Sequence, residues 1–275
     1  MSQQLRWLIP LAFILAACVA QPPITEQQIY KVYLPLVTSN KFFGVATDSN
    51  GAAAIVKTRA SSYRNWNWLP LSGVGNAEFI PEICYPRAGC PLTPAVGSSA
   101  YLLGVNEPNI NEPGGAGVCA KDYIEAWHTI LQTYAPTHRM ASPGVSYVPN
   151  TIVCKDGMME ALNGIDWLTT FWNLYTQRGF SDYPDPSFVV VNFHCYPNDY
   201  QGCYDIAGIT QQYITWSVAH GASEVWITEW DAGDRVINDM RDVNREKEWL
   251  RYWQAQPMVT RVFYYQDYNY PAPGD

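Results

Sequence analysis

The sequence predicts an α/β protein: a compact (β/α)8 TIM barrel that is either abbreviated or truncated after its eighth strand. Two observations favour this fold class. From Phe42 onward, short apolar and β-branched runs alternate with amphipathic helical stretches, which is the pattern of βα units around a parallel sheet. Eight such runs follow one another, the number that closes this kind of barrel. An open doubly wound sheet is the alternative, but no glycine-rich phosphate turn follows the first run.

The predicted strands share short apolar or β-branched runs and cover residues 42–47, 62–68, 77–83, 100–106, 139–144, 188–196, 224–230 and 261–267. The predicted helices have apolar residues at helical spacing and cover residues 120–135, 164–179, 209–221 and 242–256. No helix is visible between the second and third strands, so that connection must be short. The chain also ends soon after the eighth strand, without an obvious last helix.

The amino-acid composition limits the kinds of molecule that the protein is expected to bind. Only 15% of the 275 residues are charged and 48% are hydrophobic, so the chain has the composition of a folded protein rather than a disordered one. The net charge is −8 and no cluster of Lys and Arg occurs, which argues against a nucleic-acid partner. The 11 Trp and 19 Tyr suit surfaces that bind neutral polar ligands such as sugars, although packing between barrel and helices explains many of them equally well.

The N-terminus has the pattern of a targeting segment. Arg6 precedes the apolar stretch 7–17, which is too short to span a bilayer comfortably. The stretch ends in Leu-Ala-Ala-Cys, which resembles the lipobox of bacterial lipoproteins and implies a signal peptide at 1–18 with a lipidated Cys18. An ordinary signal peptide cut nearby is the alternative. Both predict export, to the extracellular space or the cell surface, with a tether at 19–41 and the folded domain at 42–275.

Export makes the cysteines informative. Apart from Cys18 the chain has six, an even number that predicts disulfides in an oxidising compartment. Six cysteines allow fifteen connectivities. The expected pairs, chosen by proximity and by what then remains, are Cys84–Cys90, Cys195–Cys203 and Cys119–Cys154. Because there is no Cys-x-x-Cys and the histidines are scattered, no metal site is expected.

Two glutamates stand at the ends of predicted strands. Glu107 closes the fourth strand in "LLGVNEPN", and Glu229 closes the seventh in "EVWITEWD". The C-terminal ends of barrel strands meet at one mouth, so both carboxylates are expected to face it. Strand alternation predicts that each caps an inward apolar row, and the two rows are Leu103 with Val105 and Val225 with Ile227.

The sixth predicted strand brings two more functional groups to the same rim. Its residues Asn192, His194 and Tyr196 share one face with Val190. By contrast, Glu78 and Glu82 are expected to be surface charges. For an isolated Asn-Glu-Pro, a polar strand end that begins a loop is as good an explanation as a catalytic group.

A pair of carboxylates across a cleft is what glycosidic bond hydrolysis requires. One carboxyl group protonates the leaving oxygen, and the other attacks the anomeric carbon or activates water. These roles need environments that separate the two pKa values. We expect Glu107, in a less polar pocket, to be the protonated acid. Glu229, held by hydrogen bonds, would stay ionised as the nucleophile.

Three motifs together carry a family resemblance: "LLGVNEPN" at 102–109, "NFHCYP" at 192–197 and "VWITEWD" at 225–231. Their order and positions resemble clan A of the retaining glycoside hydrolases, and within it glycoside hydrolase family 128, the Asl1-like endo-β-1,3-glucanases. The resemblance implies that Glu107 is the acid/base and Glu229 the nucleophile. It further implies substrate-binding or positioning roles for a set of neighbours: Asn106 at the sugar 2-hydroxyl, His194, Tyr196, Trp66, Trp68 and Trp230.

The function that follows from the resemblance is an exported retaining endo-β-glycosidase that hydrolyses β-glucan, with β-1,3 linkages as the first choice. It implies a polysaccharide partner, no cofactor, no metal, contact with the membrane only through a lipidated Cys18, and a monomer. Two alternatives stay open: a non-catalytic carbohydrate-binding surface lipoprotein, and a barrel glycosidase for β-1,4 or β-1,6 linkages. The candidate disulfides and the missing last helix depart from the family pattern and leave substrate and subsite number open.

Overall fold

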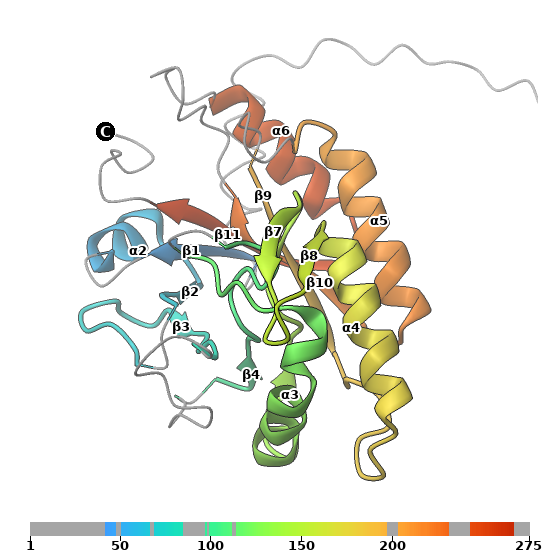
Figure 1. The fold of residues 1–275 in the computed structure, drawn as a ribbon. Coiled ribbons are helices and arrows are strands. Elements are labelled where there is room, and N and C mark those ends of the chain that lie inside the picture. Colours follow the sequence, from blue (N-terminus) through green and yellow to red (C-terminus); the bar gives the residue numbers. More distant parts are fainter. Residues whose placement is uncertain are drawn as a thin grey trace, which may run out of the picture. The chain divides into compact units, whose positions relative to one another are not determined.

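A computed structural model of the chain describes residues 42–47, 51–66, 69–84, 97, 99–111, 114–196, 203–230 and 243–266. The chain divides into two compact units, 1–38 and 39–275. The first unit lies outside the described residues, and so do the predicted signal peptide and tether. The second unit contains all the elements labelled in Figure 1.

Seven strands form one parallel sheet in the order β3-β2-β1-β11-β10-β9-β6. Their bounds are β1 Phe43–Thr47, β2 Ser62–Arg64, β3 Glu78–Phe79, β6 Val145–Ser146, β9 Val190–Cys195, β10 Glu224–Trp230 and β11 Val259–Gln266. A second parallel pair consists of β4 Tyr101–Leu102 and β5 Arg139–Met140. Each of the eight predicted strands overlaps at least one of these elements.

Backbone hydrogen bonds close the sheet into a ring. Beyond β3, Ile83 N–H donates to the Leu103 carbonyl at 3.0 Å, which joins β3 to β4. Beyond β5, Ser142 N–H donates to the Val190 carbonyl at 2.8 Å, which joins β5 to β9. With β5 and β6 counted as one interrupted strand, eight strand positions are bonded edge to edge. The predicted (β/α)8 barrel is therefore confirmed.

The four predicted helices are confirmed as α3 Ala120–Tyr134, α4 Gly164–Arg178, α5 Ile206–Ala219 and α6 Val243–Gln254. Local chemistry sets their ends. Asn163 caps α4 by accepting from Asp166 N–H, and Gly179 ends it with φ 71°. Among the described residues between β2 and β3 there is no helix, as expected. Four elements lie outside the predicted ranges: the short helix α2 Ala52–Thr58, strand β6, and the strands β7 Asn150–Val153 and β8 Met159–Leu162 of an antiparallel hairpin.

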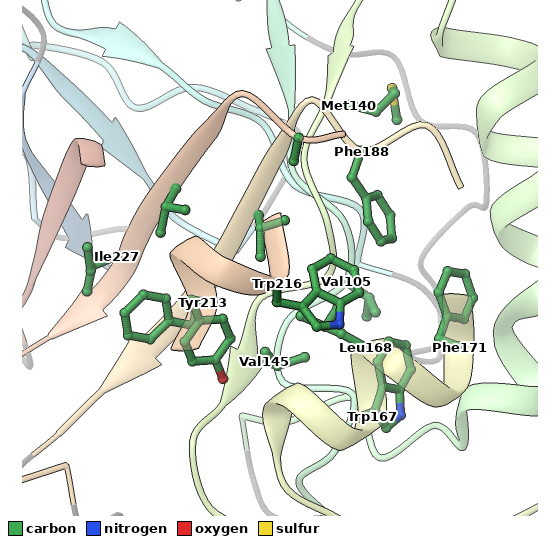
Figure 2. Close-up of a cluster of buried hydrophobic side chains, with 14 of the residues drawn as sticks. Val105, Met140, Val145, Trp167, Leu168, Phe171, Phe188, Tyr213, Trp216 and Ile227 are labelled. Atoms are coloured by element: carbon green, nitrogen blue, oxygen red, sulfur yellow. The ribbon is translucent and has the colours of Figure 1, made fainter. Parts of the chain in front are cut away.

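Two hydrophobic layers line the barrel wall. The inner cluster draws on residues of nearly every strand, among them Ala46, Leu103, Ala141, Val190, Trp226 and Phe263. The outer cluster lies between wall and helices, and Figure 2 shows part of it, where Trp167 and Phe171 of α4 lie near Val105. Fully burying such side chains contributes roughly 1.5–3 kcal/mol each, so the outer layer holds the helices on the barrel.

The positions of three residues in these layers show that part of the predicted strand alternation is wrong. Val105, Val225 and Ile227 belong to the outer layer, so they do not share an inward row with the glutamates. Strand β4 ends at Leu102, and regular alternation does not extend to Val105. The alternation predicted for the sixth strand is confirmed, with Val190 in the inner layer.

The described residues contain two of the three predicted disulfides, Cys119–Cys154 and Cys195–Cys203. The first ties the start of α3 to the β7–β8 hairpin. Cys84 is also disulfide-bonded, and its predicted partner Cys90 lies outside the described residues. In the described parts of the chain, none of the helices is both long and apolar enough to cross a membrane.

Candidate active site

Glu229 reaches the barrel interior through a bulge in β10. Against β9, Ile227 pairs with Phe193 and Glu229 pairs with His194, so Thr228 is an extra residue on the β10 side. The Thr228 hydroxyl donates to Asn192 Oδ1 at 2.8 Å inside the barrel. A bulge of this kind lets two successive side chains point to one face. The predicted inward position of Glu229 is therefore correct, but its physical reason is the bulge rather than alternation.

Glu107 sits on a strained backbone just beyond β4. Its φ is +40°, a left-handed conformation that is uncommon for a residue with a side chain. Such a conformation costs about 1–3 kcal/mol and persists only where the surroundings hold it. Here Glu107 N–H donates to the Gly144 carbonyl at 2.7 Å, and the Glu107 carbonyl accepts from Ile110 and Ala116 at 3.1 Å each.

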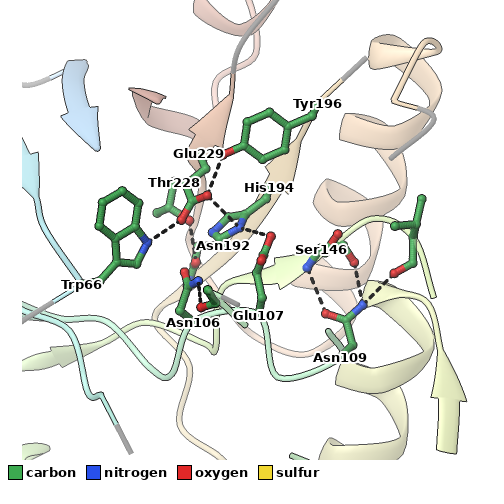
Figure 3. A network of polar contacts seen from close by, with 12 residues as sticks. Trp66, Asn106, Glu107, Asn109, Ser146, Asn192, His194, Tyr196, Thr228 and Glu229 are labelled. Carbon is green, nitrogen blue, oxygen red and sulfur yellow. Dashed lines mark hydrogen bonds and ion pairs between the residues drawn. The ribbon is translucent and has the colours of Figure 1, made fainter. Parts of the chain in front are cut away.

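The two glutamates meet around one imidazole, as Figure 3 shows. His194 Nδ1 lies 2.8 Å from Glu107 Oε1 and 3.5 Å from Glu229 Oε2. One oxygen of each carboxylate and a nitrogen of this imidazole lie within 4.8 Å of one another, and all three side chains are buried. The structure thus brings together both predicted catalytic residues and the predicted histidine.

The hydrogen bonds fix which imidazole nitrogen carries the proton. Arg64 Nη1 lies 3.3 Å from His194 Nε2. A guanidinium can only donate, so Nε2 must accept and Nδ1 must bear the hydrogen. That hydrogen points toward the carboxylates.

Glu229 is surrounded by donors. Trp66 Nε1 donates to Oε1 at 2.7 Å, the Tyr196 hydroxyl donates to Oε2 at 2.6 Å, and Arg64 Nη1 lies 3.1 Å from Oε1. Burial by itself raises the pKa of Glu229, but the electrostatic effect of His194, the Arg64 charge and the bonds from Tyr196 and Trp66 outweigh burial and lower it. Glu229 is therefore ionised at neutral pH.

Sequence reasoning missed Arg64, a buried cation at the end of β2. Its Nη2 forms an ion pair with Glu82 Oε2 at 2.6 Å and donates to Asn106 Oδ1 at 2.8 Å. Glu82 is 2% exposed, so its predicted surface position is wrong. Glu78 likewise pairs with Arg261, at 3.0 Å. The available signal for Arg64 was a cation inside the second predicted strand, two residues before the predicted Trp66.

The predicted aromatic residues separate into two groups. Trp66 and Tyr196 both touch Glu229, and Tyr265 at the end of β11 packs edge-on against both rings with centroids 5.7 Å away. Tyr265 was not predicted as a site residue. Trp230 is 1% exposed and packs on Trp253 of α6, so the structure does not bring it to the mouth.

The substrate-binding role predicted for Trp230 is therefore wrong. Trp230 follows Glu229 in the chain, and its side chain lies on the outer face of β10, where it belongs to the outer cluster. Trp68, the other predicted platform residue, lies outside the described residues. Asn106 does lie in the network, with its Oδ1 bound by Arg64 and its Nδ2 donating to the Gly114 carbonyl at 3.0 Å.

The cluster of Glu107, His194 and Glu229 is compact enough to hold a metal ion. Its chemistry is less suited to one. The nitrogen that faces the carboxylates carries a proton, and the Arg64 guanidinium lies 3.1 Å from Glu229, where it repels a second cation. The arrangement suits proton transfer and nucleophilic attack between two carboxyl groups.

A family model described as "Glycosyl hydrolase catalytic core" matches residues 42–272. No curated protein matches the sequence. Among solved structures, the chain is similar to a GH128 (subgroup III) curdlan-specific exo-β-1,3-glucanase from Blastomyces gilchristii in complex with glucose. That match has 19% identity and a TM-score of 0.60 over 81% of this chain and 88% of the other.

Two further structures have the same fold. A GH128 (subgroup I) endo-β-1,3-glucanase from Amycolatopsis mediterranei in complex with laminaritriose matches at 20% identity and TM-score 0.57, over 82% of this chain and 88% of that one. A GH128 (subgroup VII) oligosaccharide-binding protein from Cryptococcus neoformans matches at 15% identity and TM-score 0.59, over 85% and 86%. These likenesses confirm the fold that the three motifs predicted. With the family model covering most of its length, the chain belongs to the glycosyl hydrolase catalytic core family.

Proposed function

We propose that this member of the glycosyl hydrolase catalytic core family is a retaining endo-β-glycosidase that hydrolyses β-glucan, with β-1,3 linkages as its substrate. The observation that carries the proposal is the pair of buried glutamates with one oxygen of each within 4.8 Å around His194. Retaining enzymes hold their two carboxyl groups about 5–5.5 Å apart, whereas inverting enzymes need roughly 6.5–9.5 Å to admit a water.

In the first step Glu229 is the nucleophile and Glu107 the acid. A Glu229 oxygen attacks the anomeric carbon while Glu107 gives its proton to the glycosidic oxygen, the bond to the leaving sugar breaks, and a glycosyl ester forms on Glu229. The lowered pKa of Glu229 keeps the nucleophile ionised. Trp66 and Tyr196 hold its two oxygens in place for attack.

In the second step Glu107, now ionised, takes a proton from water as the water oxygen attacks the anomeric carbon on the face opposite Glu229. The bond between that carbon and the Glu229 oxygen breaks, which frees the Glu229 carboxylate. Two inversions give net retention, and Glu107 ends protonated as it began. His194 Nδ1–H, 2.8 Å from Glu107 Oε1, stabilises the negative charge that Glu107 carries between the two steps. Asn106 is proposed to contact the sugar 2-hydroxyl.

The choice of β-1,3-glucan rests on the motif resemblance and is supported by the activities of the similar structures. Two of them, from B. gilchristii and A. mediterranei, are β-1,3-glucanases. Trp66 and Tyr196 each pack edge-on against Tyr265 beside the proposed nucleophile, and the half-buried rings of Trp66 and Tyr265 offer faces on which a sugar ring can stack. Trp68 is proposed to extend this platform.

Export belongs to the same proposal. We propose cleavage before a lipidated Cys18, a tether at 19–41, and a monomeric enzyme at the cell surface. The disulfides Cys119–Cys154 and Cys195–Cys203 support an oxidising compartment. Cys18→Ser should release active protein from membranes; a wild-type protein that is already free in the medium would contradict the lipid anchor.

Reducing-sugar release from a panel of glucans tests the activity. Curdlan and laminarin (β-1,3), carboxymethylcellulose (β-1,4) and pustulan (β-1,6) serve as substrates, with Glu229→Ala as the inactive control. We expect release from the β-1,3-glucans alone, with products of several lengths from the start. A single small product from chain ends would contradict endo action. Binding without release would instead support an oligosaccharide-binding protein, as the similar C. neoformans protein is.

A further inference from the structure

Asn109 is a buried amide with no role in the proposed chemistry. It is 0% exposed and stands two residues after Glu107. Its Oδ1 accepts from Ser146 N–H at 3.0 Å, and the two hydrogens of its Nδ2 are shared among the carbonyls of Ser146 and Val148 at 2.9 Å each and of Leu162 at 3.3 Å. In Figure 3 it lies beside the glutamate network without joining it.

These bonds complete a two-point attachment of the turn that carries Glu107. At one point Glu107 N–H donates to the Gly144 carbonyl at 2.7 Å. At the other, Asn109 exchanges two bonds with the backbone of Ser146. Gly144 and Ser146 lie on one segment at β6, so the turn 107–109 is fixed to that segment at both ends. A left-handed φ of +40° at Glu107 needs such over-determined surroundings.

The same amide also secures the unpredicted hairpin. Val148 lies just before β7, and Leu162 ends β8. Asn109 Nδ2 therefore donates to a backbone carbonyl at each end of the β7–β8 hairpin. The Cys119–Cys154 disulfide ties the hairpin to the start of α3, which follows the Glu107 turn in the chain. The hairpin and the turn therefore support one another.

We infer that Asn109 is a positioning residue for the acid/base: it holds Glu107 in its left-handed conformation, with its carboxylate on His194 Nδ1. The inference rests on the proposed function, in which Glu107 protonates the leaving group. Without the Asn109 bonds the turn relaxes, and the Glu107 carboxylate leaves the position 2.8 Å from His194 Nδ1. Proton delivery to the glycosidic oxygen then fails, while attack by Glu229 continues.

This split is what the test measures. A substrate with a 2,4-dinitrophenyl leaving group needs little protonation, whereas a laminari-oligosaccharide needs full protonation. In Asn109→Ala, kcat/KM should fall about 100-fold on laminaritetraose, as for a displacement of about 1 Å in a catalytic group. On 2,4-dinitrophenyl β-laminaribioside it should fall less than about threefold, because kcat/KM reports the first step, in which general acid catalysis matters little for that leaving group.

Asn163→Ala is the matched control. Asn163 follows Leu162 directly and caps α4, so its loss destabilises the start of that helix, next to the same end of the hairpin, without removing a bond to the Glu107 turn. Both substrates should react at nearly the wild-type rate. If Asn109→Ala does not fold, Asn109→Ser is tested in its place. The serine hydroxyl is one bond too short to hydrogen-bond the three carbonyls that the Asn109 amide reaches.

Equal losses on the two substrates, or no loss, would overturn the inference while leaving the proposed function intact. If the wild-type protein hydrolyses neither substrate, the proposed function fails, and crystal structures of wild type and Asn109→Ala decide the inference. A variant in which Glu107 leaves positive φ and its contact with His194 supports positioning. A folded variant in which both features persist contradicts it.

Discussion

The ends of β4 and β10 each deliver one glutamate to the same imidazole, and they do so by different means. Glu229 follows a bulge on a seven-residue strand, and its two oxygens meet Trp66, Tyr196 and Arg64. Glu107 follows a two-residue strand, and its own backbone is left-handed. Among the described residues, the side chain that contacts its carboxylate is His194.

The difference matches the two roles. A nucleophile must stay ionised and must not turn, which several charge-assisted donors ensure. An acid/base must both give and take a proton, which a carboxylate crowded by cations does poorly. Side chains around its carboxylate thus hold Glu229, the proposed nucleophile. Backbone hydrogen bonds of its own turn hold Glu107, the proposed acid/base.

The largest expected effect comes from removing the nucleophile. Glu229→Ala should lower kcat on β-1,3-glucan by about 10⁴-fold or more, as removal of a covalent nucleophile does elsewhere. Azide should restore turnover of activated substrates, because it fits the space of the lost carboxylate. The product would be an α-glycosyl azide, identified by proton NMR. Rescue by azide that yields the β-azide would contradict the assignment.

Removing the acid/base should cost less and depend on the leaving group. Glu107→Ala should lower kcat/KM on laminari-oligosaccharides about 10²–10⁴-fold, the range for general acid catalysis. On a 2,4-dinitrophenyl glycoside kcat/KM should change little. Steady-state kinetics with both substrates measures the split. If Glu229→Ala shows this dependence and Glu107→Ala does not, the two roles are exchanged.

The buried cation beside the nucleophile should matter chiefly for stability. Arg64→Met leaves the carboxylates of Glu82 and Glu229 without their guanidinium, which should lower the free energy of unfolding by about 3–5 kcal/mol. Adding Glu82→Gln should recover part of the loss. Urea unfolding followed by fluorescence measures both. The matched control is Arg139→Met, whose half-exposed pair with Glu224 should be worth about 1 kcal/mol or less. Equal losses for both arginines would contradict the account.

The smallest effect should be a shift in the pH profile. The Tyr196 hydroxyl lowers the pKa of Glu229, so Tyr196→Phe should raise it. Glu229 must be ionised to attack, and a higher pKa leaves it protonated over a wider acidic range, so the acid limb of kcat/KM should move to higher pH. Tyr213→Phe is the control, because that buried hydroxyl has no hydrogen-bond partner in the described structure. An acid limb that stays in place in Tyr196→Phe would show that the bond does not tune Glu229.

The sequence predicted the barrel, its long strands and helices and the two glutamates of the candidate site, because periodicity and strand ends are local signals. It could not reveal the bulge at Thr228, which depends on pairing with β9 and which reverses the faces of Val225 and Ile227. The Arg64–Glu82 pair was hidden for the same reason, since it joins two separate strands. The β7–β8 hairpin lacks an alternating apolar pattern and is held instead by Asn109 and a disulfide.

The central claim is that Glu107 and Glu229 act as acid/base and nucleophile of a retaining enzyme, and the configuration of the first product tests it most directly. Proton NMR of a laminari-oligosaccharide digest, recorded within the first minutes and before mutarotation, shows which anomer forms. One oxygen of each carboxylate lies within 4.8 Å of the other, which favours the short carboxyl separation of retaining enzymes over the longer one that an inverting water needs. The account predicts the β-anomer first, with the α-anomer growing in slowly. An initial α-anomer would contradict it, whatever the rates of the variants.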